Sequence, residues 1–149
     1  MTLAPVWHLF GQDHLPYRLL LLARMIDRRS ARELQKFGLS LAEWRVLAFI
    51  GVAGPASASM IGKFGEIDRA EISRAVARLE SKQLIERRPD EKHRKRFIIS
   101  PTEAGQSLFE QVREDRRRFF RDMTEGLGQA DRQLIDKGLE TMALNLLQD

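Results

Sequence analysis

The 149-residue chain contains no cysteine. This absence excludes disulfide bonds, a thiolate nucleophile and zinc sites built from thiolates. Long apolar runs are also missing, because the longest one in the first predicted helix covers only residues 19–23, against the roughly 20 residues that a membrane span needs. The first residues lack the charged and apolar stretches of a signal peptide. We therefore expect a cytoplasmic protein that does not enter the membrane.

Residues that commonly perform catalysis or bind metals are scarce. The three histidines, His8, His14 and His93, have no metal-ligand spacing. A nucleophile elbow, a phosphate-binding loop and an HExxH motif are all absent from the sequence. We predict a protein that is not an enzyme and needs no cofactor; substrate turnover or a stoichiometric metal would support the enzyme alternative.

Basic charge is modest in total but concentrated in one place. The formal net charge is +4, and residues 87–96 alone contain six basic and two acidic side chains. This short segment therefore accounts for the excess of the whole chain. A concentrated basic patch is typical of proteins that bind polyanions. The alternative is a solvated loop that only keeps the protein soluble.

The spacing of apolar residues predicts a mainly helical fold with one small β-hairpin. Breaks at glycine and proline divide the pattern into predicted helices over residues 17–37, 40–50, 57–64, 68–82, 101–125 and 130–147. Two strands are predicted over residues 84–88 and 96–99, joined by a turn. A serine or aspartate followed three residues later by glutamate predicts capping boxes at Ser40, Asp68 and Ser100.

The order of elements in the middle of the chain is that of a helix-turn-helix followed by a wing. The second helix of such a motif fits the major groove with its N-terminal residues at the base edges, while a basic hairpin reaches the neighbouring minor groove. Alternatively, these arginines form a solvated helix face with local ion pairs. The residues predicted to contact DNA are Arg69, Ala70, Ser73, Arg74, Arg78, Lys92, Arg94, Lys95 and Arg96.

Several segments resemble, in the same order, the MarR family of bacterial transcriptional regulators. Residues 68–80 are similar to that family's recognition helix, residues 84–90 to its first wing strand, and residues 102–105 to the start of the following helix. Residues 38–40 and 44–47 match the opening of its second helix. The resemblance covers nearly the whole chain.

The sequence departs from the family pattern at three places. His93-Arg94-Lys95 stands where the family often has Asp-Arg-Arg, which removes any contact made by that aspartate. The turn glycine, Gly65, comes one residue early. Pro101 replaces a usual leucine, which fits Ser100 as the cap of the helix.

The resemblance implies a homodimer that binds duplex DNA as a repressor or, less often, an activator. Residues 1–37 and 102–149 would form the dimer interface, and residues 38–101 the winged helix-turn-helix domain. The terminal segments also contain more large apolar side chains than a small domain readily buries, although the long helices could instead fold back as a bundle within one chain. A dimer would read a pseudo-palindromic operator with half-sites about 10 bp apart.

The resemblance further implies release from DNA by a small aromatic or phenolic effector bound between the dimer helices and the DNA-binding domain. An aromatic wall with a cation suits a planar carboxylate. An acyl-thioester of a phenolic acid is a second possible ligand, and Trp44 is also a candidate core residue. The candidate effector-binding residues are His14, Tyr17, Arg18, Trp44 and Arg45.

An RNA-binding or structural module with a winged fold is the remaining alternative, since a fold does not choose its nucleic acid. Binding of single strands usually needs an aromatic platform on which bases stack. The only aromatic residue near the basic patch is Phe97, which strand alternation predicts to face the core. The sequence therefore favours duplex DNA.

Overall fold

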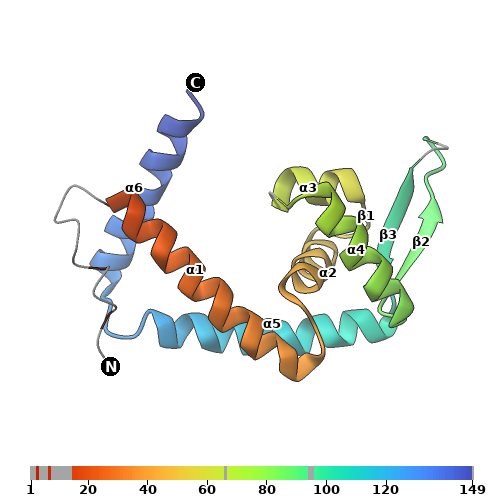
Figure 1. Ribbon diagram of the computed structural model, residues 1–149, viewed down its shortest axis with the longest axis horizontal. Helices are drawn as coiled ribbons and strands as arrows, with labels where there is room; N and C mark the ends of the chain where they lie inside the picture. The colour runs from red at the N-terminus through yellow and green to blue at the C-terminus, as the bar shows by residue number, and fades with distance from the viewer. Residues whose placement is uncertain (1–2, 4–6, 8–14, 66, 94–95, 149) are drawn as a thin grey trace. The chain divides into compact units, whose positions relative to one another are not determined.

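The computed structural model describes residues 3, 7, 15–65, 67–93 and 96–148 (Figure 1). The helices are α1 (Leu15–Leu34), the 3-10 turn η2 (Gln35–Phe37), α2 (Leu41–Ala53), α3 (Ala58–Gly65), α4 (Arg69–Ser81), α5 (Glu103–Met123) and α6 (Gln129–Leu146). The strands are β1 (Ala56–Ser57), β2 (Ile85–Pro89) and β3 (Phe97–Pro101). The predicted fold class, mainly helical with a small β-hairpin, is confirmed. Among the described residues, no helix is both long and apolar enough to span a membrane.

The chain divides into two compact units, Met1–Arg113 and Glu114–Asp149. The boundary between them falls inside α5. The division that the sequence predicts, at residues 37/38 and 101/102, is a functional one and stays a prediction.

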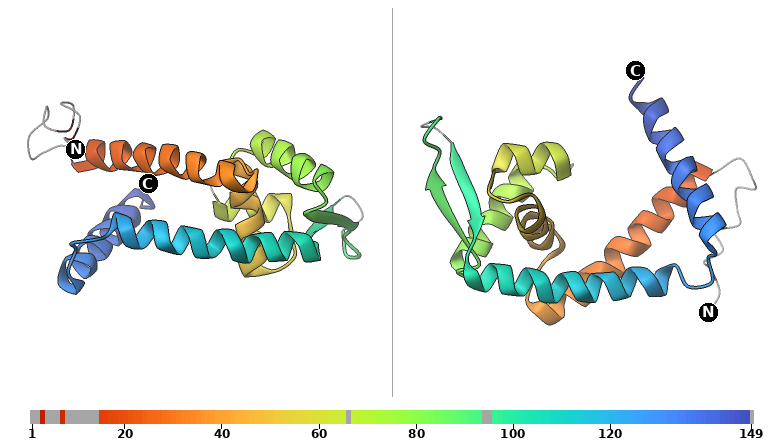
Figure 2. Two further views of the ribbon diagram at one scale, coloured as in Figure 1. Left: turned by 90° about the horizontal axis from the view of Figure 1, so that it is seen from below. Right: turned by 180° about the vertical axis from the view of Figure 1, so that it is seen from behind.

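The sheet is antiparallel and has three strands in the order β1-β3-β2. The predicted hairpin forms its β2–β3 part, which projects beside α4 (Figure 2). The sequence analysis missed β1, which pairs Ala56 with Ile99 and Ser57 with Ile98. A two-residue strand is too short to leave an alternation pattern. Through β1, the residues that precede α3 are joined to the inner strand of the hairpin.

The hydrophobic core of the first unit lies between α2, α3, α4, the sheet and the first turns of α5. Its largest fully buried side chains are Phe109, Leu34, Leu47, Ile50, Ile61, Ile72, Leu79, Ile99, Val46 and Val112. Phe109 of α5 stacks on Trp44, with ring centroids 6.0 Å apart. The helix-turn-helix is thereby seated on α5 as well as on α2.

One predicted helix end, at Gly51, is wrong. The sequence analysis ends the second helix before Gly51, but α2 continues to Ala53 and is followed by Gly54, whose φ is +83°. A β-carbon on Gly51 would lie 2.7 Å from the Phe109 ring. Gly51 is therefore a helical residue that makes room for an aromatic ring, and not a helix breaker.

The capping box at Ser40 is confirmed in both halves. The hydroxyl of Ser40 accepts from the Glu43 amide at 3.2 Å, and the Glu43 carboxylate accepts from the Ser40 amide at 2.7 Å. At Asp68, the carboxylate accepts from the amides of Ala70 and Glu71 at 2.9 and 3.1 Å. Within the described residues, the reciprocal bond from Glu71 is not formed, so Asp68 is a single cap and the predicted box is half right.

The third predicted cap, at Ser100, is wrong. Ser100 and Pro101 belong to β3, where they pair with Glu86 and Ile85. The strand continues because these pairs complete the ladder with β2, and α5 begins only at Glu103. Thr102 caps it instead, since its hydroxyl accepts from the Gly105 amide at 3.1 Å and donates to the Gln83 carbonyl at 2.8 Å.

The second unit consists of the end of α5, a turn containing Gly126, and α6. In this unit the Arg116 guanidinium lies 4.2 Å from the centre of the Phe119 ring. Much of its apolar surface is left open. Its exposed large apolar side chains are Phe120, Met123, Leu127, Leu134, Ile135, Leu139, Leu144, Leu146 and Leu147.

Candidate nucleic-acid interface

The helix α4 separates a buried face from an exposed one, as its sequence predicts. The buried stripe consists of Ile72, Ala75, Val76 and Leu79. Successive residues on one helix face recur every three to four positions, so the other face is left to solvent. The five residues of α4 predicted to contact DNA are all exposed: Arg69, Ala70, Ser73, Arg74 and Arg78.

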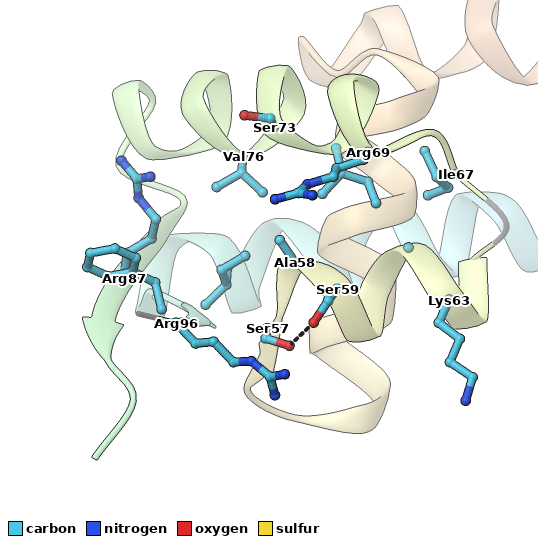
Figure 3. A pocket seen from close by; sticks show the side chains of 14 residues that line it. Ser57, Ala58, Ser59, Lys63, Ile67, Arg69, Ser73, Val76, Arg87 and Arg96 are labelled. Atoms are coloured by element: carbon cyan, nitrogen blue, oxygen red, sulfur yellow. Dashed lines mark hydrogen bonds between the residues drawn. The ribbon is translucent and has the colours of Figure 1, made fainter. Parts of the chain in front are cut away.

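A cleft of about 630 Å³ lies between α3, α4 and the sheet (Figure 3). Arg69 from α4 and Arg96 from the hairpin both extend into it. Two serines that line it, Ser57 and Ser59, are joined by a hydrogen bond of 3.0 Å. Lys63 of α3 lies at the edge with its ammonium group pointing outward. The cleft therefore combines cations from three elements with hydroxyl groups.

Sequence reasoning named neither Lys63 nor Arg87 as interface residues. Lys63 is the single basic residue of α3, and no local pattern sets it apart. Arg87 enters the sequence-based prediction only as one of the six basic residues of segment 87–96. Both residues line the cleft because α3 and β2 flank α4 in the folded chain.

Arg87 holds the wing against the end of α4. Its Nε donates to Glu80 at 3.0 Å, and a second nitrogen forms an ion pair with the other oxygen of that carboxylate. The hydrogen bond from Arg87 lowers the pKa of Glu80, and the same bond raises the pKa of Arg87. The guanidinium also lies 5.9 Å from the centre of the Phe97 ring.

Phe97 is 53% exposed, so the prediction that it faces the core is wrong. Phe97 pairs with Pro89 at the outer end of the hairpin. Alternation predicts burial only where a core covers the sheet, and here about half of the side chain is open to solvent. The cleft therefore has an aromatic residue at its rim.

Hydrogen bonds of Asp90 hold the described part of the wing turn. The Asp90 carboxylate accepts from the Lys92 amide at 2.9 Å, and the Asp90 amide donates to the Arg96 carbonyl at 2.9 Å. Lys92, His93 and Arg96 are exposed. Arg94 and Lys95 lie outside the described residues, so their predicted role stays a prediction.

Glu43 is a buried carboxylate at the start of α2, with only 3% of its side chain exposed. One oxygen accepts from the Lys82 ammonium at 2.7 Å and lies 3.6 Å from Nε of Arg78. Burial alone would raise the pKa of Glu43, but hydrogen bonds from Lys82 and Ser40 outweigh it and hold the pKa below its ordinary value. Sequence reasoning saw Glu43 only as a helix cap, because Lys82 is 39 residues away.

Of the candidate effector residues that the structure describes, Tyr17 and Arg18 lie apart from Trp44 and Arg45. Trp44 is half-buried against Phe109, and Arg45 pairs with Asp27 of α1 at 3.1 Å. Tyr17 and Arg18 are near the start of α1, so Tyr17 lies roughly 15 Å along the helix from Asp27. His14 is outside the described residues. The effector site stays a prediction, and among the described residues no acidic or histidine cluster is arranged to hold a metal.

A short helix, a recognition helix and a hairpin on a three-stranded sheet define this chain as a winged helix-turn-helix protein. Among solved structures, a MarR/EmrR family transcriptional regulator from Acinetobacter sp. ADP1 superposes with a TM-score of 0.82 at 26% identity, covering 91% of this chain and 96% of that one. A MarR family regulator from Listeria monocytogenes, complexed with DNA, has the same fold, with a TM-score of 0.83 at 22% identity over 93% and 92% of the chains.

Sequence comparison points to the same family. The profile of the MarR family matches residues 37–96. The chain is 28% identical over 91 residues to the HTH-type regulator YwoH of Bacillus subtilis, covering 61% of this chain and 66% of that protein. It is also 28% identical to the HTH-type transcriptional repressor IacR of Pseudomonas putida, covering 77% and 69% of the two chains. Residues 37–96 therefore match the MarR family of transcriptional regulators, and the fold of the chain is that of solved MarR family regulators.

Proposed function

We propose that this protein is a sequence-specific transcriptional regulator that binds duplex DNA as a homodimer and represses its target genes. The main supporting observation is the exposed arginine face of α4 beside a cleft lined by Arg96 of the hairpin. A recognition helix and a basic wing on one surface suit adjacent grooves of a duplex.

The residues of α4 divide into two roles. Arg69 and Arg74, in its N-terminal half, are suited to bidentate hydrogen bonds with guanine, and Ala70 to contact with a thymine methyl group. Arg78, toward the other end, is suited to a phosphate. Relatives support the class of partner, since the S. aureus MepR structure is a complex with DNA.

The wing supplies further cations to the same surface. Lys92 and Arg96 are exposed there, with Arg94 and Lys95 next to them in the sequence. Basic side chains at a wing tip bind phosphates and the negative potential of a narrow minor groove.

The proposed dimer uses residues 1–37 and 102–149, leaving residues 38–101 as the DNA-binding domain. Exposed apolar side chains in both terminal segments support this proposal, because a soluble monomer rarely leaves so many uncovered. In α1, Leu20 is 59% exposed, and in α6, Leu134 is 72% exposed.

The proposal also states that the protein represses its genes and that a small ligand relieves this repression. The description of IacR as a repressor supports repression here. We propose that a small aromatic or phenolic acid, or its acyl-thioester, releases the operator by binding at His14, Tyr17, Arg18, Trp44 and Arg45, residues that the dimer would have to bring together. Purified protein should then lose its operator when such a ligand is added.

Selection of duplex DNA from a random pool tests the main proposal. The purified protein would be used at about 0.15 M salt with excess competitor. Enrichment of a pseudo-palindrome with half-sites about 10 bp apart is the expected result. Failure to enrich any sequence, together with equal competition by single-stranded RNA, would contradict it; the exposed Phe97 makes that competition necessary.

A further inference from the structure

Glu43 links the recognition helix to the rest of the DNA-binding domain from inside the protein. We infer that Glu43 is a positioning residue for DNA reading: it fixes the C-terminal end of α4 through Lys82 and presents Arg78 to the DNA backbone. The inference rests on the proposed function. It concerns a residue that, being buried, cannot itself touch DNA.

The two oxygens of the Glu43 carboxylate face different elements. Oε2 accepts from the Ser40 amide at 2.7 Å, which ties it to the start of α2. Oε1 accepts from the Lys82 ammonium at 2.7 Å, immediately after α4. A buried carboxylate that loses its cation is strongly unfavourable, so this distance between α2 and α4 is held firmly.

Lys82 is held from a second side. Its ammonium group also donates to the carbonyl of Gly38, at 2.7 Å, in the turn that joins α1 to α2. A cation at the C-terminal end of a helix is favoured by the helix dipole. The end of α4 is therefore fixed to the α1–α2 turn as well as to Glu43.

Arg78 is the member of this network that reaches solvent. Its Nε faces Glu43 at 3.6 Å, and half of its side chain is exposed. The two terminal nitrogens find no acceptor among the residues that the structure describes. Arg74 lies one helical turn earlier on the same exposed face. Glu43 thus orients a guanidinium whose outer nitrogens are open to a phosphate.

The inference predicts that Glu43→Gln changes the affinity for random duplex DNA and the affinity for the operator in different ways. Attraction to any DNA depends on the number of cations, and Glu43→Gln adds one net positive charge. Binding to the operator depends on geometry, because hydrogen bonds tolerate only small displacements. Affinity for random duplex DNA should therefore hold or rise, while affinity for the selected operator falls by about tenfold, the effect of one lost charged hydrogen bond.

Glu86→Gln is the matched control. Glu86 also forms an ion pair, with Arg88, but it lies on β2, outside the proposed dimer segments and the proposed DNA contacts, and its replacement changes the net charge by the same amount. Dissociation constants of wild type, Glu43→Gln and Glu86→Gln would be measured on the operator and on random duplex, with the active fraction determined by stoichiometric titration. The preference for the operator over random duplex should fall only in Glu43→Gln. A purely structural role would lower the active fraction and leave that preference unchanged.

A double-mutant cycle tests the role of Arg78. If Glu43 acts through Arg78, then Arg78→Ala should cost less operator affinity in the Glu43→Gln background than in the wild type. Should Glu43→Gln fail to fold, the double variant Glu43→Leu/Lys82→Met, which leaves no unpaired buried charge, replaces it, and the same loss of discrimination is expected. An unchanged preference in the folded variant, or additive effects in the cycle, would overturn the inference. Failure of wild type to prefer any operator would instead contradict the proposed function.

Discussion

Gly105 lies directly against the backbone of Leu84. A β-carbon on Gly105 would come within 1.8 Å of the Leu84 carbonyl oxygen. That oxygen also accepts from the Thr102 amide at 3.1 Å, so the close approach is maintained by a hydrogen bond. The first turn of α5 thereby rests on the segment that enters the wing.

Gly105→Ala should lower the free energy of unfolding by about 3 kcal/mol or more, because the obstructing atom belongs to the backbone and cannot rotate away. Urea denaturation measures this loss. Gly138→Ala in α6 is the control, since a β-carbon there would meet no atom of the described residues within 4 Å. The control should be neutral or more stable by up to about 1 kcal/mol. Equal midpoints for Gly105→Ala and wild type would contradict the described packing.

Gln83 has a left-handed backbone, with a φ of +58°, directly after the cap residue of α4. Side chains with a β-carbon are strained in this region, where glycine is the usual residue after a helix. Gln83→Gly should therefore raise the free energy of unfolding by roughly 0.5–1 kcal/mol. Gln83→Ala keeps the β-carbon and should bring no such gain. The two thermal midpoints, measured side by side, check this; equal midpoints would mean that the strain is absent.

Arg74→Ala should weaken operator binding and relax the sequence preference at one base pair. One bidentate contact to guanine contributes about 1–3 kcal/mol of discrimination. Competition with operator variants changed at single positions measures the effect. If all variants lose affinity by the same factor, Arg74 contacts only the backbone, and its assignment as a base-reading residue is wrong.

Arg94→Ala should weaken binding to every duplex alike. Each phosphate contact adds close to one to the slope of log affinity against log salt, so the variant should lose about one from that slope. Titrations of fluorescent duplex at several salt concentrations give the slope directly. Unchanged affinity at every salt concentration would show that the wing assignment is wrong.

The lowered pKa of Glu43 predicts a loss of stability in acid. The folded state binds this proton more weakly than the unfolded state, so the contribution of Glu43 is complete above the ordinary value of 4.5 and is lost as the pH falls through the lower folded pKa. The free energy of unfolding should decrease over that range, and less steeply in Glu43→Gln. Denaturant titrations at a series of pH values test this, and parallel curves would argue against the Glu43–Lys82 contact.

Sequence reasoning succeeded where the deciding contacts are local. The buried stripe of α4 follows from spacing along one helix, and the cap at Ser40 from two residues three positions apart. It failed where contacts with an element distant in the sequence determine the local structure. Gly51 is a helical residue whose missing side chain makes room for Phe109, and Ser100 stays in a strand because β2 pairs with it.

At the candidate site, too, local features could be predicted from the sequence, and features that depend on distant elements could not. Exposure of the arginines on α4 could be predicted from their own helix. The fixing of Arg78 by Glu43, and the burial of Glu43 itself, depend on α2 and α4 packing together. Phe97 was misplaced because alternation shows which side of a strand a residue occupies and does not show where the core ends.

The short strand β1 limits how this domain can move. Because β1 shares β3 with the hairpin, tilting the wing away from the helix-turn-helix would break the pairing of Ala56 with Ile99, both of which are almost fully buried. A hinge at this point is therefore unfavourable, and α4 and the wing root should turn as one rigid body. For the proposed homodimer, this rigidity predicts that the proposed effector releases DNA by changing the spacing of two rigid domains, which alters their fit to half-sites one helical turn apart.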